Sequence, residues 1–196
     1  MDTAAMTLLF ALLTVAAQLG VVFLVGLVAL GGWGPVARLR VAALEALRPQ
    51  VLPLALVVAL VATLGSLYLS EVAHFLPCKL CWYQRIAMYP IALLLGVAVV
   101  RRDLGVRPYA LALALTGLPI SAYHYLVERF PGLEATGCDP ANPCSIVWVW
   151  RFHYISIPLM AASAFALIAA LLLVVPTRPP AGGDGPARPE AVRVAG

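Results

Sequence analysis

The chain has 196 residues, of which 63% are hydrophobic and only 11% are charged. This composition lies far outside the range of soluble globular domains and predicts an integral membrane protein. The formal net charge of +4 requires no nucleic-acid partner, because arginines in the loops beside membrane segments account for it.

The first apolar run covers roughly residues 4–30, and about 20 such residues suffice to cross the hydrocarbon core of a bilayer. It begins next to Asp2, lacks a basic start and exceeds the roughly 7–15 apolar residues of a secretory signal. We therefore expect a retained helix. The loop after it predicts a short interfacial helix around residues 35–47, which Pro49 ends.

Four more apolar runs follow, at roughly 51–71, 81–100, 108–127 and 154–175. They show no strand-like alternation, so we expect an all-α membrane protein with a four-helix transmembrane bundle and one extra N-terminal transmembrane helix. The predicted division gives 1–50 to the extra helix and its amphipathic loop, 51–175 to the four-helix domain and 176–196 to a tail. The tail is rich in Pro, Gly and Ala and is predicted to be disordered.

The arginines predict the orientation, because Lys and Arg accumulate in short cytoplasmic loops. The first loop, the third loop and the tail carry most of them: Arg38, Arg40, Arg48, Arg101, Arg102, Arg107, Arg178, Arg188 and Arg193. The other side holds Lys79, Arg129 and Arg151, with Arg85 at the membrane edge. We expect a multi-pass protein of a plasma membrane, with its N-terminus and cysteine loops outside and its C-terminus in the cytoplasm.

Four cysteines lie on the outer side in this topology: Cys78 and Cys81 in one loop, Cys138 and Cys144 in the other. Four cysteines allow three pairings, and the sequence alone leaves them open. Two structural disulfides are one interpretation. A bridge that closes the loop from Cys138 to Cys144 would contribute only about 2–2.5 kcal/mol, whereas the Cys-x-x-Cys spacing is typical of fast thiol exchange.

The surroundings of the first pair favour a redox role. Pro77 suits the first turn of a helix, which would put Cys78 at a helix N-terminus, where unpaired amides stabilise a thiolate. Cys81 and Arg85 are four residues apart, so the guanidinium lies on the same helical face and favours a thiolate at Cys81. The alternative for Arg85 is a snorkelling side chain that marks the membrane boundary.

The second pair is surrounded by turn formers, in the stretch GCDPANPCS. We expect Cys138 and Cys144 to lie on an exposed loop that a soluble partner can reach. Three aromatic residues after it, Trp148, Trp150 and Tyr154, are interpreted as interfacial anchors.

Metal and haem sites are weaker interpretations of the same cysteines. A zinc site would need ligands from two separate loops in an oxidising compartment, without a His-x-x-x-His pair. Haem attachment needs Cys-x-x-Cys-His, and Trp82 follows Cys81. No metal is therefore predicted.

The stretch PCKLCWYQRIAMYP, then AYHYL after a further span, then the loop cysteine pair that leads into SIP, resembles the disulfide bond formation protein B (DsbB) family, especially its short-loop, BdbC-like branch. The resemblance covers about residues 52–175. The CxxCxxxR spacing, the cysteine order and the four-span layout together make it specific, whereas CxxC alone would be weak.

The resemblance implies a bacterial membrane enzyme that reoxidises an extracytoplasmic, DsbA-like thioredoxin-fold thiol oxidase and passes the electrons to a membrane quinone, either ubiquinone or menaquinone. The partner would attack the Cys138–Cys144 disulfide, and exchange would carry the electrons to Cys78 and Cys81. Arg85 and His124 would contact the quinone, although a histidine at the membrane edge is often only a satisfied interfacial group.

The chain departs from the family in two respects. Its loop between Cys138 and Cys144 is short, so the way these cysteines reach Cys78 is in question. It also has an extra first span. The alternatives are a vitamin K epoxide reductase-like protein and a non-enzymatic membrane protein stapled by disulfides. The first is disfavoured because its loop cysteines precede the CxxC, whereas here they follow it.

Overall fold

The computed structural model describes residues 2–32, 34–134 and 137–175, so the predicted tail lies outside the described part. All five predicted membrane segments are helices, and the short helix predicted around residues 35–47 is present between the first two. The main helices are α1 (Thr3–Ala29), α2 (Gly34–Leu47), α3 (Val51–Leu67), α4 (Lys79–Arg101), α5 (Arg107–Arg129) and α6 (Ile157–Val174). Short turns of helix occur at Arg48–Gln50, Tyr68–Val72, Leu104–Val106 and Pro131–Leu133.

Five helical segments of the described chain are long and apolar enough to cross a membrane, and α2 and α3 run together as one of them. Within the described residues, the only β-structure is two isolated bridges in the loop before α6. The prediction of an all-α, multi-pass membrane protein is therefore confirmed.

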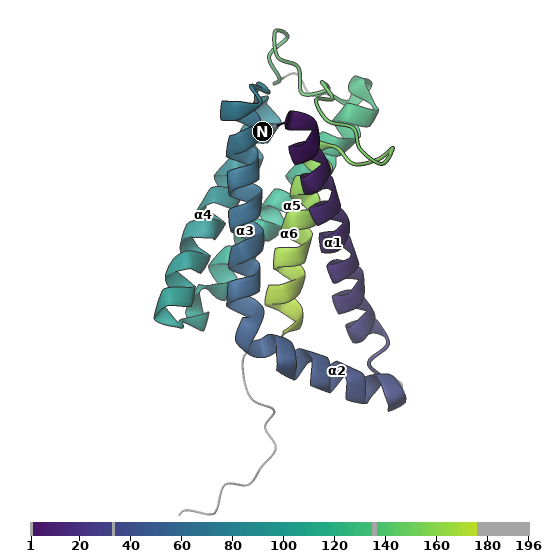
Figure 1. Ribbon diagram of the computed structural model, residues 1–196, viewed down its shortest axis with the longest axis vertical. Coiled ribbons are helices and arrows are strands. Elements are labelled where there is room, and N and C mark those ends of the chain that lie inside the picture. The colour runs from purple at the N-terminus through teal and green to yellow at the C-terminus, as the bar shows by residue number, and fades with distance from the viewer. Residues whose placement is uncertain (1, 33, 135–136, 176–196) are drawn as a thin grey trace, which may run out of the picture.

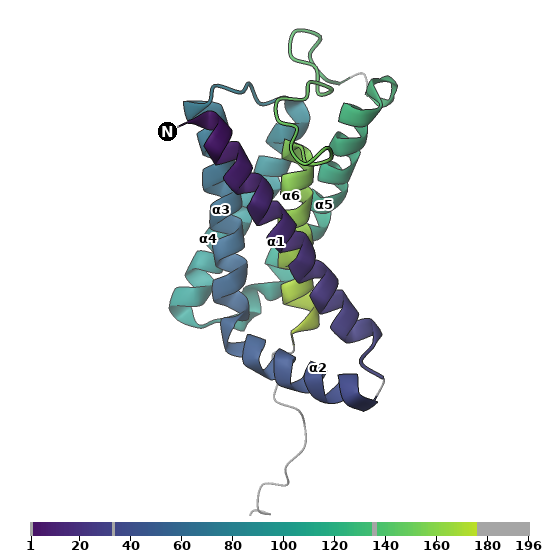
Figure 2. The same ribbon diagram turned by 45° about the vertical axis from the view of Figure 1, so that its right-hand side comes forward.

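Helices α3 to α6 form the bundle, in which α5 packs against α4 and α6, and α3 packs against the same two helices (Figure 1). Helix α1 lies outside this group and packs on α6, which it crosses diagonally (Figure 2). Helix α2 lies across one end of the molecule and links α1 to α3.

Small residues let the bundle helices approach closely. Ala55 and Ala59 on α3 and Ala110 and Ala114 on α5 are fully buried. At Gly117 a Cβ atom would lie only 2.3 Å from the ring of Phe165, so glycine is required for that ring to fill the centre of the bundle. Such small-residue contacts are the usual means of helix packing inside a membrane.

The end of the bundle opposite α2 carries both cysteine loops, and we call it the cysteine end. The segment before α4 and the loop between α5 and α6 cover this end together (Figure 1). Helix α4 begins at Lys79, with Cys78 in extended conformation as its N-cap. Pro77 therefore precedes the helix instead of lying in its first turn, a small correction to the sequence-based prediction.

Candidate functional site

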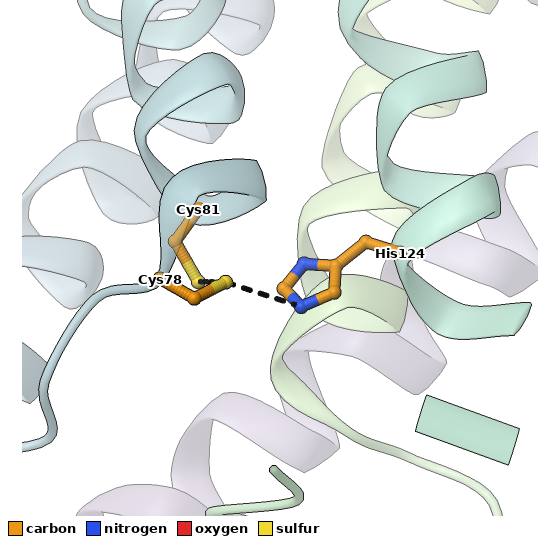
Figure 3. Close-up of side chains that lie close together, drawn as sticks. All are labelled: Cys78, Cys81 and His124. Carbon is orange, nitrogen blue, oxygen red and sulfur yellow. Dashed lines mark hydrogen bonds between the residues drawn. The ribbon is translucent and has the colours of Figure 1, made fainter. Parts of the chain in front are cut away.

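Cys78 and Cys81 form an unbridged thiol pair whose sulfur atoms are 3.4 Å apart. The N-cap position of Cys78 and the first-turn position of Cys81 turn both sulfurs toward α5, where His124 faces them (Figure 3). Cys78 is buried, whereas Cys81 is partly exposed. The two sulfurs of the motif therefore have different surroundings.

His124 connects the two cysteine pairs. Its Nε2 lies 3.5 Å from Cys78 Sγ and donates to the backbone oxygen of Cys144 at 3.0 Å. On the other side of the ring, the amide nitrogen of Gln84 donates to Nδ1 at 2.9 Å. Because a carbonyl can only accept, this arrangement favours the neutral tautomer with its proton on Nε2. Gln84 thus orients the imidazole toward the thiol pair.

The surroundings of Cys78 favour its thiolate. The hydrogen bond with Cys81 lowers the pKa of the Cys78 thiol, and burial opposes this effect. The hydrogen bond with His124 lowers it further, so the pKa lies below that of an ordinary thiol. The sequence argument favoured a thiolate at both sulfurs, at Cys78 through the helix N-terminus and at Cys81 through Arg85, and these hydrogen bonds favour the one at Cys78.

Cys138 and Cys144 form a disulfide with a Cα–Cα distance of 6.0 Å. Cys138 is partly exposed, but Cys144 is only 1% exposed. The expectation that both cysteines lie on an exposed loop is therefore wrong for Cys144. The turn formers around it predicted a loop correctly, but they carry no information about what the loop packs against.

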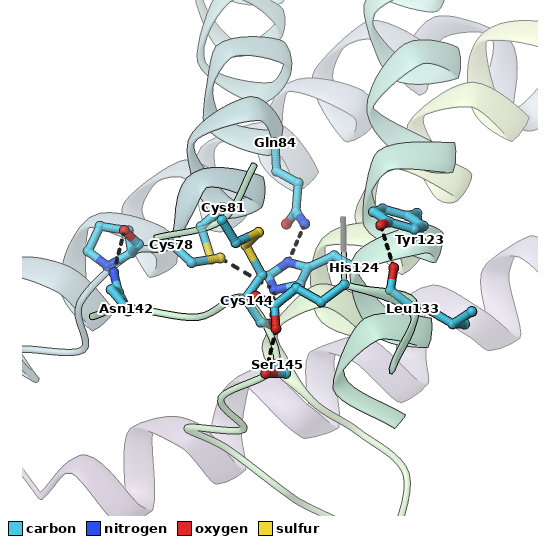
Figure 4. Close-up of a disulfide and its surroundings, with 12 residues drawn as sticks. Cys78, Cys81, Gln84, Tyr123, His124, Leu133, Asn142, Cys144 and Ser145 are labelled. Carbon is cyan, nitrogen blue, oxygen red and sulfur yellow. Dashed lines mark hydrogen bonds between the residues drawn. A yellow bond between two sulfur atoms is a disulfide. The ribbon is translucent and has the colours of Figure 1, made fainter. Parts of the chain in front are cut away.

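Glu134, in the same loop, holds Cys144 where it lies beside His124 (Figure 4). Its Oε1 accepts from the backbone N–H of Cys144 at 2.6 Å, and its Oε2 accepts from the hydroxyl of Ser145 at 2.9 Å. The Asn142 side chain also donates to the backbone oxygen of Pro77 at 3.3 Å. A six-residue separation is thus enough to bring Cys144 to the first pair, which answers the question that the short loop raised.

All four cysteines belong to one cluster at the cysteine end. Cys78, Val127 and Cys144 form its buried centre, and Cys81 and Cys138 pack against them. Both of these outer cysteines are partly exposed, whereas Cys78 and Cys144 are buried. The arrangement suits thiol–disulfide exchange, in which sulfur atoms must come into contact.

A cavity of about 360 Å³ adjoins the cluster, between α1, α3, α4 and α6. Its walls are mainly apolar, and four residues of α4 bring polar groups to it: Cys81, Gln84, Arg85 and Tyr89. His124 is not among the lining residues and lies on the other side of the thiol pair. The structure thus brings Arg85 and Cys81 together at the cavity and puts His124 between the two cysteine pairs.

Arg85 is held by α3 and by its own helix. Its Nη2 donates to the backbone oxygen of Ser66 at 3.0 Å, and its guanidinium carbon lies 5.3 Å from the centre of the Trp82 ring. The side chain is only 9% exposed, which does not fit a snorkelling arginine. Most of its N–H groups have no partner among the described residues, so they are available to an acceptor in the cavity.

These features fit a largely apolar ligand with a hydrogen-bond acceptor such as a carbonyl oxygen. Ligand sites are usually apolar cavities with a few oriented polar groups, and Arg85 supplies such a group beside Cys81.

Two cysteine-containing groups have ligand atoms close enough together for a metal ion. The first is Cys78, Cys81 and His124, and the second is Glu134, Cys138 and Cys144. In the second group the disulfide occupies both sulfur atoms, and in the first the imidazole proton is directed at a backbone oxygen.

The interpretation of the aromatic residues as membrane anchors is incomplete for Trp148. Its ring stacks on Phe75 with 5.2 Å between centroids, and it lines the cavity. Trp150 instead packs beneath the guanidinium of Arg129, whose central carbon lies 4.7 Å from the ring centre.

The sequence argument also missed Gln84 and Glu134. Gln84 carried a usable signal, because it is an uncharged polar residue at the start of a membrane span, but Glu134 resembled any loop carboxylate.

The comparisons with known proteins agree on one family. The family model described as "Disulfide bond formation protein DsbB" matches residues 48–175. Disulfide bond formation protein C of Bacillus subtilis is 46% identical over 120 residues, which are 61% of this chain and 87% of the relative.

Two further relatives have the same kind of name. A probable disulfide formation protein of Oceanobacillus iheyensis is 43% identical over 119 residues, covering 60% of this chain and 82% of the relative. One of Coxiella burnetii is 42% identical over 118 residues, covering 59% of this chain and 80% of the relative. No solved structure matches the chain. The matched region begins at residue 48, so α1 and α2 lie outside it.

Proposed function

Because this chain belongs to the disulfide bond formation protein DsbB family, we propose that it reoxidises an extracytoplasmic, DsbA-like thioredoxin-fold thiol oxidase and passes the electrons to a membrane quinone. The observation that carries this proposal is the position of Cys81, which belongs to the cysteine cluster and also lines the apolar cavity beside Arg85. Electrons from a dithiol thus have a route from the outer loop to the cavity.

The loop disulfide receives the electrons of the partner. A thiolate of the reduced partner attacks the sulfur of Cys138, and the Cys138–Cys144 bond breaks to give a mixed disulfide and a Cys144 thiolate. The second thiol of the partner then displaces Cys138, so the partner leaves oxidised and the loop pair is reduced. The different exposure of the two cysteines supports this order, because Cys144 is buried.

Internal exchange then moves the electrons to the first pair. Cys144 attacks Cys78 in the oxidised Cys78–Cys81 pair, and Cys81 leaves as a thiolate. Cys138 restores its bond to Cys144 and releases Cys78. The bridged loop pair and the reduced first pair described here correspond to the product of this exchange. The contact of one His124 nitrogen with both Cys78 and Cys144 supports the proximity that the step needs.

The cavity holds the electron acceptor in this proposal. A bound quinone supplies an acceptor for two electrons, which keeps the pathway from stalling, because a DsbA-type oxidase is already near −120 mV. Arg85 stabilises negative charge on a carbonyl oxygen in the low-dielectric cavity. Cys81 is the thiol of the pair that reaches the cavity, and Gln84 keeps His124 directed at Cys78.

We also propose the membrane orientation. The N-terminus of α1 lies at the cysteine end, whereas α2 and the loop between α4 and α5 lie at the other end. The arginines of the first and third loops therefore gather at the end opposite the cysteines, which supports a cytoplasmic position for that end. The partner then meets Cys138 outside the cell membrane.

The proposal is tested with purified protein in lipid nanodiscs, a reduced thioredoxin-fold thiol oxidase and a short-chain quinone. We expect one quinone to be consumed for each partner disulfide formed, because both are two-electron reactions. Quinone absorbance and thiol titration measure the two quantities. A non-enzymatic, disulfide-stapled membrane protein would leave both unchanged, and this result would reject the proposal.

Replacing Arg85 by alanine should raise the quinone KM by roughly 10- to 100-fold, because one charge-assisted hydrogen bond is lost in a dry cavity. The KM for the thiol partner should remain near its wild-type value, since Arg85 is remote from Cys138 in the proposed pathway. Steady-state kinetics with each substrate varied in turn measures both constants. An unchanged quinone KM would remove Arg85 from the site.

A further inference from the structure

We propose that Phe10 on α1 is a positioning residue of the acceptor site, whose ring covers the end of the cavity that carries Cys81 and Arg85. The inference rests on the proposed function for the nature of the ligand, a quinone. It assigns a role to a helix that lies outside the region matched by the DsbB family model.

Helix α1 forms a wall of the cavity, to which it contributes Phe10, Leu13, Thr14, Ala16 and Ala17. The cavity is therefore bounded by four helices, only three of which, α3, α4 and α6, belong to the family region. Without α1, the lining residues of α3 and α6 would face lipid on this side.

Polar contacts hold α1 in place. Gln18 donates to the hydroxyl of Ser163 on α6 at 3.1 Å and accepts from the hydroxyl of Tyr154 at 3.0 Å. Nearer the N-terminus, Nη2 of Arg151 donates to the backbone oxygen of Ala4 at 3.0 Å and to the hydroxyl of Thr7 at 2.8 Å. Polar contacts of this kind help to specify how helices pack in a membrane, so they hold α1 as a wall of the cavity.

The ring of Phe10 fills the space between α1 and α3. A Cβ atom at Gly65 would lie 3.3 Å from two carbons of the Phe10 ring, so the absence of a side chain there makes room for the ring. The ring also meets Tyr68 edge to face, with 6.1 Å between centroids and an interplanar angle of 70°. Such aromatic pairs have a preferred geometry, so the ring is oriented as well as close.

The contact with Gly65 also fixes the level of Phe10 along the cavity. Ser66, the next residue of α3, accepts the hydrogen bond from Arg85 at 3.0 Å. The Phe10 ring and the Arg85 guanidinium thus contact adjoining residues of one helix, and both line the cavity. The ring therefore lies at the reactive end, where it supplies an apolar wall for a bound quinone.

The test compares Phe10→Ala with Leu12→Ala in full-length protein. Leu12 is on the same helix, is 52% exposed and is not a cavity residue. Dithiothreitol serves as the electron donor, so no protein partner is needed, and short-chain ubiquinone and menaquinone are the probes. Quinone binding to the reduced protein is also measured directly from the quenching of tryptophan fluorescence, since Trp148 lines the cavity.

We expect Phe10→Ala to raise the KM and the Kd of at least one quinone by roughly tenfold, the loss expected for an aromatic contact. The KM for dithiothreitol should stay at its wild-type value, and Leu12→Ala should resemble the wild type throughout. If Phe10→Ala cannot be purified, Phe10→Leu keeps an apolar side chain without the ring, and a several-fold rise in Kd is expected.

A second variant tests the contact that positions the ring. Gly65→Ala adds a methyl group against Phe10 and should raise the quinone Kd by several-fold in the wild-type background. In the Phe10→Ala background the same methyl group meets no ring, so its effect should largely disappear. Additive effects of the two substitutions would reject the contact as the means of positioning.

The outcomes separate this inference from the proposed function. Wild-type protein that neither binds nor reduces either quinone would overturn both. Wild-type protein that binds and reduces quinone, with unchanged KM and Kd in Phe10→Ala or Phe10→Leu, would overturn only the role of Phe10. Equal losses in Phe10→Ala and Leu12→Ala would also overturn it, because they would indicate a general loosening of α1.

Discussion

Replacement of Cys81 by serine is expected to lower the rate of quinone reduction by at least about 1,000-fold, with either a protein partner or dithiothreitol as donor. Cys81 is the member of the thiol pair that lines the cavity, and a serine hydroxyl can neither form the Cys78–Cys81 disulfide nor carry its electrons. Replacement of Cys78 should have the same effect, since a single thiol cannot complete a two-electron exchange. Stopped-flow absorbance of the quinone measures the loss.

The control for these variants is a measurement of thermal stability, which shows whether they still fold. Cys78 and Cys81 are unbridged in the structure, so a serine should change the thermal midpoint of the helical circular dichroism signal only slightly. If either variant turned over quinone at the wild-type rate, the relay would be wrong. If both lost stability and the wild-type protein had no activity, the disulfides would be structural.

Replacing Cys138 and Cys144 by serine together should separate the two halves of the relay. Oxidation of the protein partner is expected to fall by at least about 1,000-fold, because the loop disulfide is the group that the partner attacks. Reduction of quinone by dithiothreitol should persist, since a small dithiol can reach the partly exposed Cys81 directly. Loss of both reactions in a folded variant would contradict two separate stages.

The single variants of the loop pair should differ. In Cys144→Ser, the partly exposed Cys138 has no internal thiol partner. It should form a stable mixed disulfide with the reduced thiol oxidase when the two proteins are mixed under oxidising conditions. In Cys138→Ser, the remaining sulfur is that of Cys144, which is 1% exposed and should be captured much less. Mass spectrometry of the trapped complex identifies the bonded cysteine. Equal trapping on both would mean that the loop opens before attack.

The five membrane helices were predictable because length and apolar composition are properties of each segment alone. The short helix α2 was also predictable from its own segment and ends at Leu47, although a helical turn that contains Pro49 joins it to α3. Helix–helix contacts are different, because lipid-facing and buried positions are both apolar in a membrane protein. The sequence therefore predicted that residues 4–30 form a helix, but not that this helix packs on α6 and lines a cavity.

The chemistry of the site was partly predictable. The spacing of Cys81 and Arg85 along one helix needs no tertiary information, and both line the cavity as the helical period requires. The buried Cys144 donates its backbone N–H to Glu134, ten residues earlier in the chain, and no local pattern indicates that contact. The quinone contact predicted for His124 stays a prediction, since its ring lies between the cysteine pairs.

The contact between Glu134 and Cys144 has a consequence for the motion of the loop. Glu134 binds the main chain of Cys144 and the side chain of Ser145, and neither hydrogen bond involves a sulfur atom. Breaking the disulfide therefore leaves both of these hydrogen bonds intact. We expect Cys144 to keep the same position in the reduced and the oxidised loop, with Glu134 as its anchor.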